Sequence, residues 1–185
     1  TTEDLLADPV FRQGFSHLAD LNLTFDAWLL HPQIPRLTDL AQAFPRTCIV
    51  LNHCGGIARS GRHARRKHDI FPEWAASMSE LAACRNVMVK LGGLGMPLSG
   101  FGFDSHPAAS SHDLADAWRP WIEHCIEQFG PDRCMFESNF PADRASYSYG
   151  MGWNAMKRLT VDLTPTARDD LFWRSASRFY DLPPV

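Results

Sequence analysis

Four short apolar runs in this chain each end in polar residues. They cover residues 23–32 (LTFDAWLLHP), 49–56 (IVLNHCGG), 87–93 (VMVKLGG) and 134–143 (CMFESNFPAD). Each apolar stretch has about the length of a buried parallel strand, and a loop with glycine or proline follows it. A (β/α) barrel builds its active site from polar residues gathered at the carboxyl ends of parallel strands. The pattern therefore predicts consecutive strand–helix units with a site at one end of the sheet.

Helical patterns separate the four runs. The first predicted helix begins at Asp8-Pro9, an acidic cap followed by a proline, and the second ends before Pro45. Residues 92–111 are rich in glycine, proline and serine and are predicted to form a long loop. Alternating strands and helices predict a parallel sheet with right-handed crossovers. The predicted helices cover residues 8–21, 35–44, 70–84, about 112–129, about 150–160 and 165–180.

The composition narrows the class of protein. With 185 residues, 45% of them hydrophobic and 21% charged, the chain is long enough for a single domain with its own core, residues 1–185. A net charge of −3 offers no general attraction for nucleic acid or for an anionic membrane surface. No apolar run approaches the roughly 18 residues that span a bilayer, and no signal peptide is visible. We therefore expect a small-molecule substrate, and neither nucleic acid nor a membrane as partner.

The cysteines and glycines argue against two further kinds of site. Five cysteines, an odd number without a CxxC pair, predict reduced thiols and a cytoplasmic location, not a disulfide framework or a structural zinc site. The glycines of LGGLGM (91–96) lack the strand and helix context, and the lysine, of a phosphate-binding loop. The chain begins Thr1-Thr2 without a methionine, so we expect that residues upstream are missing.

Polar residues at the strand ends are the candidates for chemistry. His53 follows an apolar strand and precedes two glycines, which favours a functional histidine, although a hydrogen-bonded core histidine has the same pattern. Asn139 either contributes to the site or caps the loop that follows it. Glu137 and Lys90 alternate with apolar neighbours, so each either faces a substrate or pairs with an opposite charge. Asp143, shortly after the last strand, could supply a carboxylate.

Two further segments offer candidate substrate contacts. Asp26 and Trp28 should share one face of the first strand, where Trp28 could form a wall for a flat ring, and His31 follows at the strand end. Arginine forks bind carboxylates bidentately, so Arg59 and Arg62 are predicted to contact an anionic substrate, with a merely solvated loop as the alternative. The basic loop contains Arg59, Arg62, His63, Arg65, Arg66, Lys67 and His68.

Three motifs in order carry a family resemblance. The series FDAWLLHPQIPRLTDLAQAFPRTCIVLNHCGG, NVMVKLGGLGM and FGPDRCMFESNFPAD resembles the amidohydrolase superfamily, in particular the metal-dependent-hydrolase branch that includes fuconolactonase and 2-pyrone-4,6-dicarboxylate lactonase. The resemblance implies an α/β fold, a TIM-type (β/α)₈ barrel. The four runs would then be strands five to eight, followed by two C-terminal helices. The chain would be the C-terminal half of an amidohydrolase-like barrel.

The resemblance also implies site residues. His53 stands at the family's middle-strand histidine and would polarise a carbonyl or bind a divalent metal such as zinc. Asn139 stands where the family usually has an aspartate. A neutral amide neither takes a proton from water nor binds a divalent cation well, so a metal-independent site stays open. The HxH pair expected on the first strand of the family is absent from this sequence.

The implied function is hydrolysis of a lactone, or of a related ester or amide bond, in a small carboxylated compound. The predicted catalytic residues are His53, Asn139 and Asp143, with Asn139 as an orienting hydrogen-bond donor. The alternative is a non-catalytic half-barrel that binds a ligand or assembles with a second copy or with a missing N-terminal half, since four strands leave two unpaired edges. The predicted substrate contacts are Asp26, Trp28, His31, Arg59, Arg62, Lys90 and Glu137.

Overall fold

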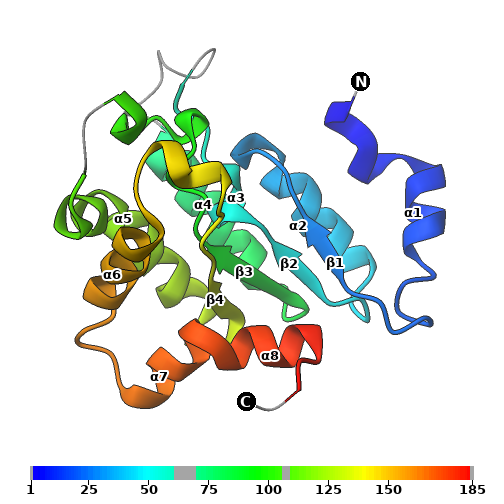
Figure 1. Ribbon diagram of the computed structural model, residues 1–185. Helices are drawn as coiled ribbons and strands as arrows, with labels where there is room; N and C mark the ends of the chain where they lie inside the picture. The colour runs from blue at the N-terminus through cyan, green and yellow to red at the C-terminus, as the bar shows by residue number, and fades with distance from the viewer. Residues whose placement is uncertain (1, 61–69, 106–108, 184–185) are drawn as a thin grey trace.

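The computed structural model describes residues 2–60, 70–105 and 109–183. These residues contain four strands, β1 (Phe25–Ala27), β2 (Ile49–Leu51), β3 (Val87–Leu91) and β4 (Cys134–Phe136). The strands form one sheet in the order β1-β2-β3-β4, and every neighbouring pair is parallel (Figure 1). The predicted parallel sheet of consecutive strand–helix units is therefore confirmed.

Helices connect the strands and complete the chain. Asp8 caps the first of them, because its carboxylate accepts hydrogen bonds from the backbone N–H groups of Val10 and Phe11 at 2.8 and 2.9 Å. The α-helices are α1 (Pro9–Phe15), α2 (Ile34–Ala43), α3 (His53–Gly56), α4 (Ile70–Ala82), α5 (Ser111–Phe129), α6 (Tyr149–Leu159), α7 (Pro165–Asp169) and α8 (Ser175–Tyr180). The 3₁₀ turns are η1 (Thr2–Ala7), η2 (His31–Gln33), η4 (Pro97–Ser99), η5 (Phe103–Ser105), η6 (Pro131–Arg133) and η7 (Ala142–Ala145), and η8 (Asp170–Arg174) is a π-helical segment.

Several predicted boundaries are wrong. The helix predicted over 8–21 ends at Phe15, beyond which hydrogen bonds close over three residues and Asn22 adopts a φ of 53°. The strands are shorter than the apolar runs: β1 covers only Phe25–Ala27 of the run 23–32, and β4 only Cys134–Phe136 of the run 134–143. The predicted helix over 165–180 is divided into α7, η8 and α8, and the predicted loop over 92–111 contains η4 and η5.

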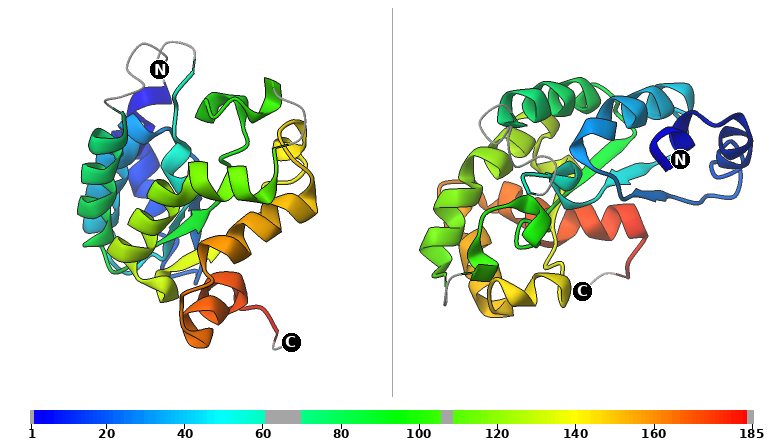
Figure 2. Two further views of the ribbon diagram at one scale, coloured as in Figure 1. Left: turned by 90° about the vertical axis from the view of Figure 1, so that its left-hand side faces the viewer. Right: turned by 90° about the horizontal axis from the view of Figure 1, so that it is seen from above.

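The main core lies on one face of the sheet. Helices α2, α4 and α5 lie side by side over this face (Figure 2), and α4 contacts both of its neighbours. Trp74 of α4 and Trp118 of α5 are almost fully buried there. The outward-facing residues of the strands are buried beneath these helices, at 0% exposure: Ile49, Leu51, Val87, Val89 and Leu91.

The opposite face of the sheet is covered differently. Figures 1 and 2 place α8 across it, on the side away from α2 and α4. Phe179 of α8 is buried in a small separate cluster with Val50 of β2 and Met135 of β4. This face would look into the interior if the sheet closed into a barrel.

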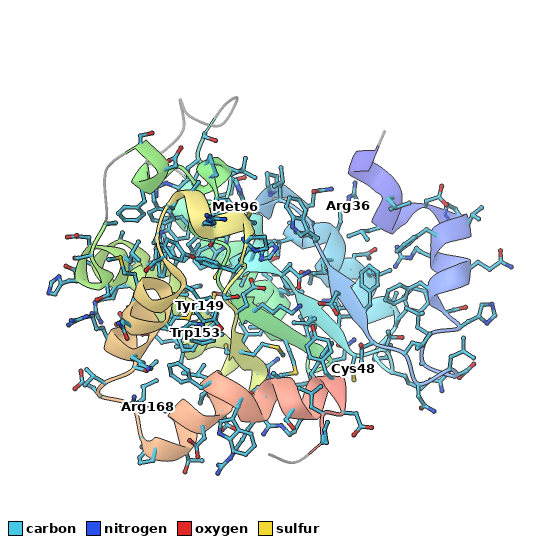
Figure 3. The ribbon with its side chains drawn as sticks, viewed as in Figure 1. Arg36, Cys48, Met96, Tyr149, Trp153 and Arg168 are labelled. Atoms are coloured by element: carbon cyan, nitrogen blue, oxygen red, sulfur yellow. The ribbon has the colours of Figure 1, made fainter. Side chains whose placement is uncertain are left out.

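The five cysteines differ in their exposure to solvent. All five cysteines are free thiols, and Cys48 is exposed while the other four are buried. Figure 3 shows Cys48 near one end of the sheet and Met96 near the other.

Within the described ranges, no helix has both the length and the apolar composition needed to cross a membrane.

Two polar side chains fasten the amino ends of the strands. The Asn86 amide nitrogen lies 3.2, 3.2 and 3.0 Å from the carbonyl oxygens of Ala41, Phe44 and Thr47, which end α2 and lead into β2. Arg133 donates in the same region to four carbonyls at the ends of α4 and α5 and at the start of β3. These contacts satisfy helix-end carbonyls that have no partner within their own helices.

We predict that Asn86→Ala lowers the free energy of unfolding by about 2 kcal/mol, because part-buried carbonyls lose their donor. Urea denaturation monitored by circular dichroism would measure it. The control is Asn154→Ala at an exposed position, which should change stability by less than about 0.5 kcal/mol. Equal effects of the two substitutions would contradict the role given to Asn86.

Candidate active site

The turn after β2 presents His53. His53 and Cys54 have positive φ values of 58° and 50°, so the chain turns sharply as α3 begins. The Trp74 indole N–H donates to the Cys54 carbonyl at 2.8 Å and fastens this turn to α4. His53 itself faces Glu137, whose Oε1 lies 2.6 Å from Nδ1 and accepts from the His53 backbone N–H at 3.1 Å. The histidine is therefore held at both its backbone and its ring by one carboxylate oxygen.

Glycines after β3 make this pairing possible. A Cβ on Gly92 would lie 2.5 Å from the Glu137 Cγ and 2.6 Å from its carbonyl oxygen. Gly93, with a φ of 67°, would place a Cβ 2.6 Å from the Cβ of His53. Because β3 lies between β2 and β4, Glu137 crosses bare backbone at Gly92 to reach His53. This explains the glycines of LGGLGM, to which the sequence had assigned no role.

A second carboxylate braces the loop after β4. Asp143 has 0% exposure and accepts hydrogen bonds from the Asn139 amide at 2.7 Å, from the Gly95 backbone N–H at 3.1 Å and from the Tyr147 hydroxyl. A Cβ on Gly95 would lie 2.9 Å from the Asp143 Cβ, so glycine is again what permits the approach. Ser146 closes the brace by donating from its hydroxyl to the Gly95 carbonyl.

Burial has the largest effect on the pKa of Asp143 and on that of Tyr147. It raises the pKa of Asp143, although the hydrogen bonds from Tyr147, Asn139 and Gly95 and the nearby His53 act in the opposite direction. Burial, together with the charge of Asp143, also raises the pKa of Tyr147. The Tyr147 phenol therefore remains a hydrogen-bond donor to the carboxylate.

Aromatic contacts hold the same loop against α6. The Phe140 ring lies 5.3 Å from Tyr149 and 5.9 Å from Tyr147, measured between centroids. Tyr149 in turn lies 6.0 Å from Trp153, and Figure 3 shows these two residues together on α6. The segment that carries Asn139 is thus packed, not loose.

His53 follows β2, and Asn139 and Asp143 follow β4, so the predicted catalytic residues all lie beyond the carboxyl ends of the strands. Gly93 lies close to His53, and Gly95 donates to the carboxylate that also binds Asn139. Asp143, predicted as a catalytic carboxylate, is fully buried in this structure, and its described side-chain contacts are with Asn139, Gly95 and Tyr147. The Asn139 amide donates to Asp143, which leaves its carbonyl oxygen to accept from other groups.

Lys90 and Asp26 form a second polar group on the inner face of the sheet. The Lys90 ammonium pairs with the Asp26 carboxylate, and the Tyr180 hydroxyl donates to the same carboxylate at 2.8 Å. Burial opposes the charge on Lys90, but the hydrogen bonds and charges of Asp26 and Tyr180 outweigh it and raise the pKa of Lys90. Of the two predicted alternatives for Lys90, the opposite-charge pair is the one present. Glu137 is likewise paired, with His53.

The remaining predicted substrate contacts separate into two groups. Trp28 is 53% exposed and meets the His53 ring edge-on at 6.1 Å between centroids, so it forms an open wall beside the histidine. His31 is buried, and its Nδ1 accepts from the Ala58 backbone N–H at 3.2 Å, which fits a structural role and not the predicted substrate contact.

Arg59, predicted to contact an anionic substrate, lies against aromatic rings. Its guanidinium lies over the rings of Phe101 and Trp121 at 4.8 and 5.7 Å, and burial lowers the pKa of Arg59. The contacts that the structure describes for the Arg59 guanidinium are therefore aromatic. Arg62 lies outside the described residues, as do the other members of the basic loop, His63, Arg65, Arg66, Lys67 and His68.

A metal centre needs several grouped ligands. Within the part of the chain that the structure describes, no group of three or more His, Cys, Asp or Glu side chains is arranged to hold a metal ion. His53 has Nδ1 engaged by Glu137, and Asn139 contributes only an amide. The described donor set therefore does not fit a complete zinc site.

Comparison with known proteins places the chain in a family. The family model for amidohydrolases matches residues 1–182. The chain belongs to the amidohydrolase family. This confirms the resemblance drawn from the three sequence motifs.

Individual relatives are consistent with this assignment. An uncharacterised protein, y4mH of Sinorhizobium fredii, is 36% identical over 93% of this chain and 52% of its own length. An L-fucono-1,5-lactonase of Burkholderia ambifaria is 31% identical over 96% of this chain and 57% of its own length. The chain thus spans little more than half the length of these curated relatives.

A solved structure shows the same fold. A crystal structure of an amidohydrolase from Burkholderia multivorans with bound zinc superimposes with a TM-score of 0.84 at 24% identity, over 98% of this chain and 60% of that one. The four parallel strands and their helices therefore correspond to a part of an amidohydrolase fold.

We predict that Gly92→Ala lowers the free energy of unfolding by about 2 kcal/mol or more, because the new methyl group overlaps both the side chain and the backbone of Glu137. Thermal denaturation would measure the loss. The matched control is Gly150→Ala in α6, where no atom lies within 4 Å of the added Cβ, and where stability should stay the same or rise by about 0.5 kcal/mol. A neutral Gly92→Ala would contradict the crossing of Glu137 over bare backbone.

The raised pKa of Asp143 predicts a pH dependence of stability. The folded chain holds the Asp143 proton to higher pH than the unfolded chain does, so this stabilising contribution is complete below the unfolded pKa and is lost as pH rises through the folded pKa. From about pH 4 upward, the unfolding free energy of the wild type should therefore fall relative to that of Asp143→Asn. A difference that stays constant, or that grows with pH, would contradict burial as the dominant effect.

Proposed function

We propose that this chain is the C-terminal half of an amidohydrolase barrel, with strands five to eight, and that the enzyme hydrolyses a lactone or a related ester or amide bond in a small carboxylated compound. The 2.6 Å pair between His53 and Glu137 at the strand ends is the observation that carries this proposal. Two L-fucono-1,5-lactonases among the relatives, 31% and 27% identical, support a lactone as the bond class.

The pair gives His53 the arrangement of a general base. Glu137 is an acceptor for the Nδ1 proton, which leaves Nε2 of the neutral ring with its lone pair. A water molecule hydrogen-bonded to Nε2 would lose a proton to it while attacking the lactone carbonyl. Glu137 faces the positive charge that the ring then acquires, in the way that carboxylates orient histidines in hydrolase triads. Protonated His53 can return the proton to the leaving alkoxide.

Neighbouring residues suit the other requirements of the reaction. The Asn139 carbonyl oxygen can accept a hydrogen bond from a substrate hydroxyl, while Asp143 fixes the orientation of its amide. Trp28 offers an exposed ring beside His53 against which a sugar or pyrone ring could lie. No step is assigned to a metal ion, because the described residues group too few ligands around His53.

We predict that His53→Ala lowers the rate of lactone hydrolysis by at least about 10²-fold, and that Glu137→Gln lowers it less, because the base survives but loses its orientation. The assay would follow acid release from a panel of sugar 1,5-lactones that includes L-fucono-1,5-lactone. The matched control, His17→Ala at an exposed position, should retain full activity. Circular dichroism of each variant reports its folding.

Two outcomes would remove the proposal. Hydrolysis at the wild-type rate in folded His53→Ala would reject His53 as the base. Binding of the lactones without turnover in the wild type, measured by calorimetry, would favour the non-catalytic ligand-binding alternative.

A further inference from the structure

The side chain at position 139 is bound by a buried carboxylate. Asp143 has 0% exposure, and its two oxygens have separate partners. Oδ1 accepts from the Asn139 amide at 2.7 Å, whereas Oδ2 accepts from the Gly95 backbone N–H at 3.1 Å and from the Tyr147 hydroxyl. A backbone N–H can only donate, so Oδ2 is an acceptor in this arrangement. Each of these hydrogen bonds is therefore one that a carboxylate suits.

The Tyr147 ring is held so that its hydroxyl reaches this carboxylate. A Cβ on Gly95 would lie 2.5 Å from Cε1 of Tyr147, and a Cβ on Gly152 in α6 would lie 2.7 Å from Cε2. Trp118 meets the same ring edge-on at 5.3 Å between centroids. Because glycines border both edges of a ring that is 6% exposed, the hydroxyl has little freedom to leave Asp143.

The backbone at Asn139 alone would also admit an aspartate. Asn139 has a φ of 51°, in the left-handed region that Asn and Asp adopt more readily than most residues. Its carbonyl oxygen accepts from the Asp143 backbone N–H at 3.1 Å, so the two residues are joined through the main chain as well. The segment after β4 that contains them, yellow in Figure 1, turns over the carboxyl end of the sheet. The choice between amide and carboxylate therefore depends on the side-chain partner.

Asp143 makes that choice. An aspartate at position 139 would bring a carboxylate oxygen to the place of the amide nitrogen, 2.7 Å from Oδ1 of Asp143. Two carboxylates so close cannot both be ionised, and burial of Asp143 excludes the water that would screen them. An amide offers an N–H to Asp143 and has its oxygen on the opposite branch, directed away from it. Asn139 is only partly buried, so this oxygen remains an acceptor for a ligand.

We propose that Asp143, held by Tyr147 and Gly95, fixes Asn139 with its amide nitrogen inward and its carbonyl oxygen toward the substrate. Asp143 and Tyr147 are then positioning residues, and Asn139 is the residue that selects the ligand. Because the oxygen only accepts hydrogen bonds, it fits a lactone that carries a free hydroxyl group. The identity of the ligand rests on the proposed function, whereas the need for an amide at position 139 does not.

Thermal denaturation of the full chain at mildly alkaline pH tests the need for an amide. Asn139→Asp should lower the midpoint by about 5 °C or more, because two carboxylates then face each other. Adding Asp143→Asn exchanges the two side chains, so the introduced amide can donate to position 139 while its oxygen accepts from Gly95 and Tyr147. This exchange should recover about half of the loss or more. The matched control, Asn154→Asp at an exposed position of α6, should shift the midpoint by less than about 2 °C.

Lactone hydrolysis tests the orientation of Asn139. Asp143→Asn alone opposes two amide nitrogens, so Asn139 should turn over and present its NH₂ group to the substrate. For the lactone that the wild type hydrolyses best, KM should then rise about tenfold. The kcat should change less than about threefold, because His53 and Glu137 keep their contact. In the exchange variant a carboxylate oxygen again faces the substrate, and KM should return toward the wild-type value.

Tyr147→Phe tests the second positioning residue. It removes the hydroxyl that donates to Asp143 and should raise KM by about threefold. Tyr149→Phe is the matched control, because Tyr149 is 53% exposed and its ring also contacts Phe140. This control should leave KM unchanged. Equal effects of the two substitutions would remove Tyr147 from the inference.

The other outcomes are equally decisive. An Asn139→Asp variant as stable as the wild type, or an exchange that recovers no stability, would overturn the need for an amide. An unchanged KM in Asp143→Asn, or a KM that stays raised after the exchange, would overturn the orientation of Asn139. If the wild type hydrolyses no lactone, the proposed function fails while the thermal midpoints still decide the pairing. If Asn139→Asp does not fold, a folded exchange variant supports the pairing and an unfolded one rejects it.

Discussion

The carboxylate of Glu137 starts beyond β4 and ends on the ring of His53 beyond β2, so it has to cross β3. It can do so only because Gly92 has no side chain, since a Cβ there would lie 2.5 Å from the Glu137 Cγ. The same oxygen accepts from the His53 backbone, whose positive φ turns the ring toward it. The orientation of the His53 ring, the shape of the turn after β2 and the glycines after β3 are thus parts of one steric arrangement.

A second set of contacts, centred on Asp143, fixes the loop that follows β4. Asp143 gathers three donors in a buried position and fixes Asn139, while Gly95 gives it access to a backbone N–H. The two carboxylates therefore differ in kind. Glu137 is partly exposed and contacts the His53 imidazole, whereas Asp143 has no exposure and contacts Asn139. Glu137 and Asp143 thus differ in burial and in their partners, although both lie in the same strand-end motif.

Sequence patterns predicted the parallel sheet, because strand periodicity and strand-end polarity are local properties of the chain, and three motifs in order predicted the family. They could not predict that Glu137 pairs with His53, which depends on a residue two strands away and on Gly92 between them. The aromatic contacts of Arg59 could not be predicted, because its charge was visible in the sequence and its neighbours, Phe101 and Trp121, were not. Tyr147 was missed although it follows Asp143 by one helical turn. Tyr180 was missed because nothing local indicates that α8 crosses the inner face.

The tautomer of the His53 ring tests the central claim most directly. ¹⁵N NMR of the histidine side chains distinguishes a proton on Nδ1 from one on Nε2. If Glu137 holds the ring through Nδ1, the neutral His53 of the wild type carries its proton on Nδ1, and this preference disappears in both Glu137→Gln and Gly92→Ala. A neutral ring protonated on Nε2, or an Nδ1 tautomer that persists in both variants, would contradict the account.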